Sequence, residues 1–233
     1  YQCSRYVDIY KALEDIARER KLEPEERKEQ KKYAKLADAL TPLAKGMNSE
    51  YCNQNTYDGL QIHGGSGFMM EYPIQRYYRD ARITSIYEGT TQLQVVAAIR
   101  YVTNGSYLAQ MREFETAEVS EALQPILARA KAMADKFEEA TAYVKEAGEP
   151  VFHDLCARHL VEMAGDIIML HLLLHNATEN AELFGKEYDD ELHRVIIHGI
   201  LHLCGINDKG PGEREIMEAA ENKALALLKE MKR

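Results

Sequence analysis

Tryptophan is absent from this sequence, proline occurs only 6 times in 233 residues, and runs that alternate β-branched with polar residues are missing. Alternating runs are typical of half-buried strands, so their absence argues against a sheet-based fold. Strong helix formers (Ala, Leu, Glu, Lys, Met and Arg) fill most stretches instead. The sequence therefore predicts an all-α protein, long enough for one large domain or two small ones.

Paired cysteines and long apolar runs are also lacking. Cys3, Cys52, Cys156 and Cys204 show no paired spacing, which is typical of reduced thiols and not of a disulfide framework. The longest apolar run, at 167–175, is too short to cross a bilayer and contains two histidines. The first residues, YQCSRYVDIYKALED, lack the pattern of a secretion signal. We therefore expect a soluble, cytoplasmic protein with no membrane partner.

The net charge of −9 is unevenly distributed. Residues 1–112 carry 16 Lys and Arg against 14 Asp and Glu, residues 113–185 carry 5 against 14, and residues 186–233 carry 8 against 10. We expect these three segments to be a helical domain, an acidic helical extension and a C-terminal segment. Because the acidic extension would repel phosphates, we do not expect RNA to be a partner.

Helical periodicity, caps and breakers predict helices over about 4–20, 25–60, 74–84, 90–103, 116–147, 150–180, 189–204 and 212–231. The pair Thr41-Pro42 is typical of an N-cap followed by proline in the first helical turn. The run 25–60 is therefore either two helices or one helix with a kink.

The stretch QIHGGSGF at 61–68 places Gln61 at the end of a helix and the adjacent glycines Gly64 and Gly65 after it. Adjacent glycines let backbone amides approach a ligand closely, which suits a pyrophosphate. A glycine-rich helix end with no ligand is the alternative, and it is the commoner case.

Glu88 lies in RDARITSIYEGTTQLQ, between two expected helices. A carboxylate at such a place can project into an apolar cleft and act as a general base. Thr90 and Gln92 begin the next helix, where their side chains could hydrogen-bond a cofactor. The alternative for Glu88 is an acid that only interacts favourably with the helix dipole.

In combination, QIHGGSGF, EYPIQRYYRDARITSIYEGTTQLQ and AAIRY closely resemble the C-terminal helical domain of acyl-CoA dehydrogenases. This resemblance covers about residues 5–104, and residues 105–180 resemble the additional helical tail of the larger bacterial members. It implies a helical bundle with additional C-terminal helices, FAD as the cofactor, acyl-CoA as the substrate and a homo-oligomer. The N-terminal helical domain and the middle β-domain of the family are not found in this sequence, so we expect a partial enzyme that is inactive alone.

The resemblance also implies roles for individual residues. Glu88 removes the α-proton of the acyl thioester while a hydride passes to the flavin. Gly89 lies beside the thioester, and Arg100 lies near the CoA. The residues that contact FAD are Thr90 and Gln92, together with Gln61, Gly64 and Gly65, which hold the FAD of a neighbouring subunit.

A second motif, HGILHLCGIND, begins at His198 and places His202 four residues later, on the same face of the expected helix. This spacing holds zinc in zinc proteases, and Asp208 could supply an oxygen ligand after Gly205 ends the helix. The glutamate of a protease HExxH motif is missing. Two ordinary helix histidines are the alternative.

The segment around this motif, at about 188–226, resembles the C-terminal end of YbeY-type zinc-dependent endoribonucleases of rRNA maturation, whose pattern is HGxLHLxGxDH. The resemblance implies His198 and His202 as zinc ligands and places Asp208 where the family usually has a third histidine. Nothing upstream resembles the sheet or the basic RNA-facing residues of that family.

Segments of two families therefore meet near residue 185. Three functions stay open: a partial acyl-CoA dehydrogenase, a zinc-dependent endoribonuclease, and a non-enzymatic helical oligomer.

Overall fold

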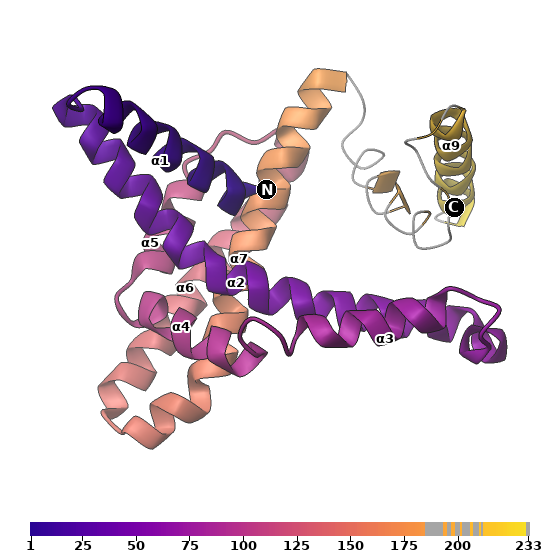
Figure 1. The fold of residues 1–233 in the computed structure, drawn as a ribbon, viewed down its shortest axis with the longest axis horizontal. Helices are drawn as coiled ribbons and strands as arrows, with labels where there is room; N and C mark the ends of the chain where they lie inside the picture. Colours follow the sequence, from indigo (N-terminus) through magenta and orange to yellow (C-terminus); the bar gives the residue numbers. More distant parts are fainter. Residues whose placement is uncertain are drawn as a thin grey trace. The chain divides into compact units, whose positions relative to one another are not determined.

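The computed structural model of the chain describes residues 1–184, 193–194, 197–198, 201, 206, 210 and 212–231. The described residues form helices and turns and contain no strand, which confirms the predicted all-α class. Figure 1 shows the elements α1 (Gln2–Glu19), α2 (Pro24–Ile62), η1 (Gly64–Phe68), α3 (Ile74–Thr84), α4 (Thr91–Thr103), α5 (Ser106–Phe114), η2 (Glu121–Leu123), α6 (Gln124–Ala147), α7 (Pro150–Phe184) and α9 (Glu213–Met231).

The chain divides into two compact units. The first consists of residues 1–117 and 128–172, and it contains α1 to α5 with most of α6 and α7. The second consists of residues 118–127 and 173–233, and it contains α9. The Glu88 motif therefore lies in the first unit and the His198 motif in the second.

α2 is a single helix of 39 residues with Pro42 inside it. The Thr41 hydroxyl does not cap a second helix, because it donates to the carbonyl oxygen of Ala37 in the preceding turn, at 2.7 Å. Proline removes one helical hydrogen bond and bends the helix, and Figure 1 shows α2 changing direction along its length. Of the two alternatives that the sequence leaves open, the structure has the single helix.

α1 and α3 pack against opposite ends of α2 (Figure 1). Near the first end, the rings of Tyr6 and Tyr33 lie 5.6 Å apart. Near the other end, Ile74 of α3 is buried against Gly59, where an added Cβ would lie 3.0 Å from the Ile74 Cδ1 atom. The second half of α2 and α3 therefore form a helical hairpin that carries η1 at its tip.

The core of the first unit lies where α2 and α4 to α7 meet. Its largest fully buried side chains include Tyr107 and Met111 of α5, Phe137 of α6 and Ile167 of α7. Burial of one such side chain contributes about 1.5–3 kcal/mol, so this cluster stabilises the unit. The Tyr107 hydroxyl donates to the carbonyl oxygen of Ala39 at 2.7 Å, which satisfies the one polar atom of that buried ring.

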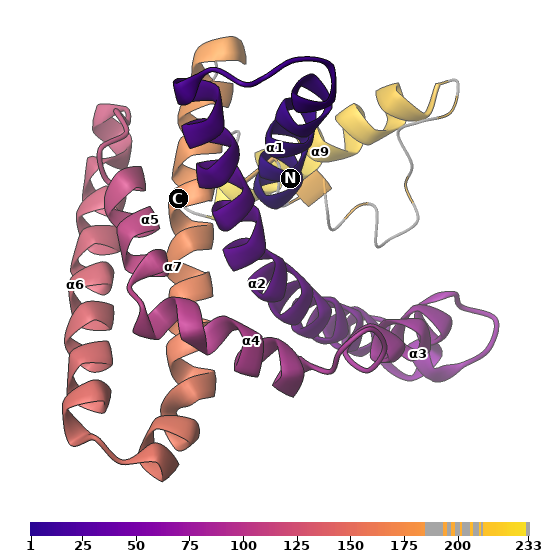
Figure 2. The same cartoon turned by 60° about the vertical axis from the view of Figure 1, so that its left-hand side comes forward.

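α6 and α7 run side by side as a hairpin (Figure 2), and near its turn the rings of Tyr143 and Phe152 meet edge to face at 6.1 Å. The apolar run 167–175 is only part of a much longer helix. By length and composition alone, Pro150–Thr178 could cross a membrane, and 44% of its most apolar window is buried in the structure. Core helices of soluble proteins have the same character, and Ala164 lies in the core with no exposure.

α5 is a helix where the sequence analysis expects none. Its start is defined by Asn104 and Gly105, which were expected only to end the preceding helix. Gly105 has a φ of 77° and precedes α5, and the Asn104 Oδ1 atom accepts the Ser106 amide at 2.9 Å. The same two residues therefore end α4 and begin α5. The next helix also begins later than expected, at Gln124, where Pro125 occupies the first turn.

Gly165 of α7 packs directly against Met47 of α2, because a Cβ at Gly165 would lie 1.8 Å from the Met47 Sδ atom. We expect Gly165→Leu to lower the free energy of unfolding by about 1–3 kcal/mol, since it overfills this contact. Chemical unfolding measures the effect, and adding Met47→Ala should recover part of the loss. Gly65→Leu is the control, because nothing lies within 4 Å of a Cβ there. Equal losses in both glycine variants would contradict this packing.

Candidate functional site

Glu88 lies in the turn between α3 and α4 and has an unusual backbone conformation. Its φ is 51°, and no other non-glycine residue in the described part of the chain has a positive φ. Such a conformation costs about 1–3 kcal/mol and persists only where neighbouring structure imposes it. The Glu88 side chain is exposed. The apolar cleft that the sequence analysis expects around it is therefore not formed by this chain alone.

One face of α2 holds the C-terminal end of α3. The Lys45 ammonium donates to the carbonyl oxygen of Thr84, and the Ser49 Oγ atom lies 3.0 Å from the same oxygen. One turn further, the Asn53 amide donates to the Ala81 carbonyl oxygen at 3.2 Å. The three α2 residues are four apart and so share one helix face. They satisfy carbonyls that the last turn of a helix leaves unpaired.

The start of α4 is fixed in a similar way. Thr90 is the N-cap of α4, and the Thr91 hydroxyl donates to the Glu50 carboxylate at 2.5 Å. The Gln94 side chain donates to the carbonyl oxygen of Gly89 at 3.3 Å. Both sides of the Glu88 turn are therefore anchored, which explains how its positive φ is maintained.

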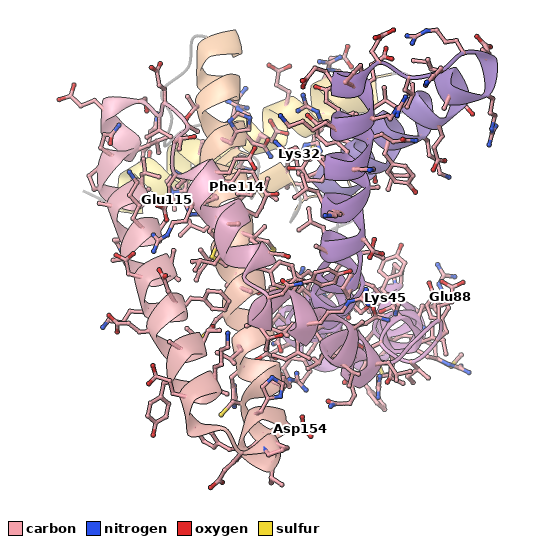
Figure 3. The ribbon with its side chains drawn as sticks, turned by 90° about the vertical axis from the view of Figure 1, so that its left-hand side faces the viewer. Lys32, Lys45, Glu88, Phe114, Glu115 and Asp154 are labelled. Atoms are coloured by element: carbon pink, nitrogen blue, oxygen red, sulfur yellow. The ribbon has the colours of Figure 1, made fainter. Side chains whose placement is uncertain are left out.

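The Lys45 ammonium also links α2 to the turn itself. It lies 5.1 Å from the centre of the Tyr87 ring, and Figure 3 shows Lys45 and Glu88 in the same part of the structure. A cation over an aromatic face contributes about 0.5–1 kcal/mol at an exposed site. This contact orients the residue immediately before Glu88.

An open hollow of about 430 Å³ lies beside the turn. It is lined by Glu50, Asn53, Arg82, Ser85, Ile86, Thr90, Thr91 and Gln92. Thr90 and Gln92, the two residues of α4 that the resemblance assigns to FAD, are both exposed here. The Arg82 guanidinium donates to Ser85 at 2.5 Å. A guanidinium beside the N-terminal end of a helix favours an anionic group.

The glycine loop lies at the other end of α3. Gln61 is exposed near the end of α2, and no atom lies within 4 Å of a Cβ added at Gly64 or Gly65. A ligand could therefore approach this backbone closely, as a pyrophosphate requires. Gly67 has a structural role instead, because an added Cβ would lie 2.7 Å from the Leu60 carbonyl oxygen.

The loop and the Glu88 turn are not brought together within one copy of the chain. α3, with its 11 residues, runs between them, and a helix of this length spans about 16 Å. The two parts of the predicted flavin site therefore lie at opposite ends of α3.

Arg100 of α4 is exposed but anchored. Its guanidinium lies 4.6 Å from the centre of the Tyr101 ring, donates to the Tyr101 hydroxyl at 2.6 Å and reaches Asp38 at 3.5 Å. These contacts fix the position of a cation on the surface of α4. The resemblance assigns a residue at this position to the neighbourhood of the CoA.

Of the three metal ligands expected from the sequence, the structure describes His198, while His202 and Asp208 lie outside the described residues. The His198 Nδ1 atom lies 2.8 Å from the Oε1 atom of Glu221, and Arg194 donates to the Oε2 atom at 2.9 Å. Within the described ranges, no three His, Cys, Asp or Glu residues form a group that could hold a metal ion.

Glu221 lies on α9 and is only 7% exposed. Burial raises the pKa of this carboxyl, but the hydrogen bonds from Arg194 and His198 lower it by more, so its pKa falls below the ordinary value. Glu221 is therefore a buried carboxylate that is ionised at neutral pH.

The sequence analysis did not predict the residues that anchor the Glu88 turn or the residue that contacts His198. The four-residue spacing of Lys45, Ser49 and Asn53 could have indicated a shared helix face. The pairing of His198 with Glu221 joins residues 23 apart in the sequence and leaves no local signal.

Two protein families match consecutive parts of the chain. Residues 24–101 match the family described as "Acyl-CoA dehydrogenase, C-terminal domain". Residues 103–189 match the family described as "Acyl-CoA dehydrogenase C terminal". These matches confirm the resemblance found in the sequence, and the second of them covers all of α7.

Individual relatives fall into two groups. The chain is 48% identical over 60 residues to "Broad-specificity linear acyl-CoA dehydrogenase FadE5" of Mycobacterium tuberculosis, a match that covers 26% of this chain and 10% of that protein. It is 72% identical over 65 residues to "Endoribonuclease YbeY" of Bacteroides thetaiotaomicron, covering 28% of this chain and 45% of the relative. The endoribonuclease of the same name from Phocaeicola vulgatus is 76% identical over 59 residues, covering 25% and 43%.

The chain thus spans less than half the length of each relative that it matches. The endoribonuclease matches are also longer than the stretch 188–226 on which the sequence analysis based its resemblance. This chain therefore joins segments that match acyl-CoA dehydrogenase C-terminal families to a segment similar to YbeY endoribonucleases.

The backbone at Glu88 gives a direct test of the anchored turn. We expect Glu88→Gly to raise the free energy of unfolding by up to about 1 kcal/mol, because glycine adopts a positive φ without steric cost. Glu88→Val should lower it by about 1–2 kcal/mol, because a branched side chain is strained in this conformation. Urea unfolding measures both variants. Because the Glu88 side chain is exposed, a loss of buried surface does not contribute to the difference between the two variants. Equal free energies of unfolding for the two variants would refute the assigned conformation.

Proposed function

We propose that the acyl-CoA dehydrogenase domains of this chain contribute the catalytic base and part of the FAD site for α,β-dehydrogenation of acyl-CoA thioesters. The observation that carries this proposal is the turn of Glu88. A carboxylate with a strained backbone is held there by contacts on both sides, next to a hollow that can receive a ligand. Strain of this kind is concentrated at functional sites.

In the proposed reaction, the Glu88 carboxylate accepts the α-proton of the acyl thioester. A carboxylate base works best where water is excluded. Burial raises the proton affinity of a carboxylate, which brings it closer to that of the carbanion left when the substrate loses its α-proton. The exposed position of Glu88 in this chain means that other protein must cover it during catalysis. We infer that the chain is inactive alone.

The chain offers two places that fit FAD. Thr90 and Gln92 line the hollow beside Glu88, and the open backbone of Gly64 and Gly65, after Gln61, allows close approach of a pyrophosphate. When bound, FAD would supply the acceptor for the β-hydride of the substrate.

The substrate would lie against other residues of the same region. Gly89 would lie beside the thioester, and Arg100 would present its cation toward the CoA. The contacts of Arg100 with Tyr101 and Asp38 hold that cation in place before any ligand arrives.

Assembly is part of this proposal. Many large apolar side chains of the α2–α3 hairpin and of α4 are exposed, including Tyr57, Ile62, Phe68, Met69, Met70, Tyr72, Ile83, Ile86, Leu93 and Val96. An apolar surface of this extent is typical of a protein interface. The separation of the glycine loop from Glu88 by the length of α3 also suits a site completed by a second subunit.

A second candidate function is that of a zinc-dependent endoribonuclease of the YbeY type. The observation that favours it is the contact of His198 with the buried Glu221. Imidazole is a common zinc ligand, and a carboxylate on its other nitrogen is typical of zinc sites. The described residues hold one of the proposed ligands, His198, while the further proposed ligands His202 and Asp208 lie outside them.

The role of Glu88 can be tested by adding a polypeptide that carries the N-terminal and middle domains of a related dehydrogenase. We expect Glu88→Gln to slow exchange of the acyl-CoA α-proton with solvent by about 10²–10⁴-fold, the usual effect of removing a general base. Flavin absorbance should show that FAD stays bound. Glu14→Gln, at an exposed position of α1, is the control and should leave exchange unchanged. Near-normal exchange in Glu88→Gln would contradict the assignment.

Assembly can be tested on the chain itself. We expect light scattering to give at least the mass of a dimer at micromolar concentration, because the exposed apolar surface would be covered by a second copy. Ile62→Lys combined with Met70→Lys should shift the protein toward smaller species, since both side chains are at least 80% exposed in the isolated chain. A stable, well-behaved monomer of the unmodified chain would refute the proposed homo-oligomer.

A further inference from the structure

We propose that Gln94 is a positioning residue, which holds Glu88 in its strained backbone conformation and so fixes the direction of the proposed base. This inference deepens the function proposed for Glu88 and rests on it. Gln94 lies in the first turn of α4, six residues after Glu88, and the sequence analysis assigned it no role.

The side chain of Gln94 contacts the residue directly after Glu88. The backbone amide of Gln94 makes an ordinary helical hydrogen bond, which leaves the side chain to reach back to the turn. The side-chain amide donates to the Gly89 carbonyl oxygen at 3.3 Å. Before Glu88, the contact of Lys45 with Tyr87 is made on the aromatic ring, which does not fix the backbone. Gln94 therefore acts on the backbone of the turn itself.

Two glycines make room for the Gln94 side chain. A Cβ added at Gly89 would lie 2.5 Å from the Gln94 Nε2 atom, and a Cβ added at Gly46 of α2 would lie 3.3 Å from the Gln94 Cβ atom. The side chain is therefore packed against α2 on one side and against the turn on the other. Because α2 is the helix that also holds the end of α3, Gln94 relates the Gly89 peptide to the same fixed support.

The turn is a short loop with few torsions that can change. The Thr91 amide donates to the Ser85 carbonyl oxygen at 3.4 Å, so residues 86–90 connect two points that are one hydrogen bond apart. Within this loop, φ is 51° at Glu88 and 95° at Gly89. Glycine adopts such a value freely, whereas glutamate is strained by it. Without the hydrogen bond from Gln94, rotation at Gly89 would let the loop close with a negative φ at Glu88.

The direction of the Glu88 carboxylate follows from this backbone conformation. A change of φ from the positive to the negative region rotates the Cα–Cβ bond relative to the helices on both sides of the turn. A general base must lie about 2.6–3.2 Å from the atom whose proton it accepts, so this rotation would take the carboxylate away from the acyl α-carbon. Gln94 contacts Gly89 and not the proposed reacting atoms, so it acts through Glu88.

The stability of the chain alone tests whether Gln94 maintains the strain. Glu88→Gly should raise the free energy of unfolding of the unmodified chain, because it removes the strain. In Gln94→Leu, which keeps a side chain of similar size but has no donor, we expect this stabilising effect to be lost, because the turn has already relaxed. Such a loss is the coupling that a double-mutant cycle measures, and urea unfolding of the four proteins supplies it.

Gln54→Leu is the matched control, since it makes the same chemical change at an exposed position of α2. The stabilising effect of Glu88→Gly should be the same in Gln54→Leu as in the unmodified chain. Circular dichroism of each variant checks that the helices remain formed. A stabilising effect that persists in Gln94→Leu would overturn the proposal.

A measurement on the unmodified chain is independent of how well any variant folds. In NMR spectra, a positive φ brings the amide and Hα protons of one residue close together, so Glu88 should show a strong NOE between these two protons. The side-chain amide protons of Gln94 should show NOEs to the Hα protons of Gly89. The absence of either NOE would overturn the proposal even if Gln94→Leu does not fold.

The link to the proposed reaction is tested in the reconstituted protein described for Glu88→Gln. We expect Gln94→Leu to slow exchange of the acyl-CoA α-proton by up to about 100-fold, as displacement of a catalytic group does. The KM for acyl-CoA should stay unchanged, because Gln94 is not placed against the substrate. Rates are expressed per bound flavin, so a smaller amount of folded protein does not lower them.

The role of Gln94 and the role of Glu88 can fail separately. Slow exchange in Glu88→Gln with normal exchange in Gln94→Leu overturns only the role of Gln94. Normal exchange in Glu88→Gln overturns the assignment of the base, and the positioning of that base with it, even where the NOEs show that Gln94 holds the turn. Slow exchange in both variants, together with loss of the stabilising effect of Glu88→Gly, supports both roles.

Discussion

The carbonyl oxygen of Thr84 is the point on which the arrangement of the first unit depends. It accepts from Lys45 and lies within hydrogen-bonding distance of Ser49, both on α2, so the end of α3 is fixed to the longest helix that the structure describes. The same helix contacts α1 and α4 and packs against α7 through Met47 and Gly165. The turn of Glu88 is therefore held by a helix that is itself fixed on several sides. A strained φ at Glu88 can persist because relaxing it would disturb those contacts.

Rigid support of the turn does not make an active site, because it supplies position without burial. Glu88 is anchored through its backbone neighbours, yet its carboxylate faces solvent. A general base needs both a fixed place and a water-excluding environment. In a helical bundle, the residues of a turn between helices extend beyond the packed core, so in the proposed reaction a second layer of protein would supply the burial. The exposed apolar side chains of the α2–α3 hairpin are where such a layer would bind.

Local patterns in the sequence predicted the local features of the structure. α3 was predicted at 74–84, and the structure has the same bounds, because Tyr72-Pro73 and the glycine near Glu88 mark its ends. α5 was missed because Asn104-Gly105 is a common stop signal, and nothing local shows that it also begins a helix. The clamp on Thr84 was missed because it joins residues at least 35 positions apart. The exposure of Glu88 depends on which other domains are present, and no motif in 233 residues encodes that.

The two motifs differ in how much of their support the chain itself contains. For Glu88, contacts from α2 and α4 fix the position, but in the proposed reaction the cover would come from other protein. For His198, the supporting carboxylate and its arginine come from the same C-terminal segment, within 28 residues of sequence. The His198 side chain is therefore held from within its own segment, whereas the proposed role of Glu88 depends on protein that would cover it.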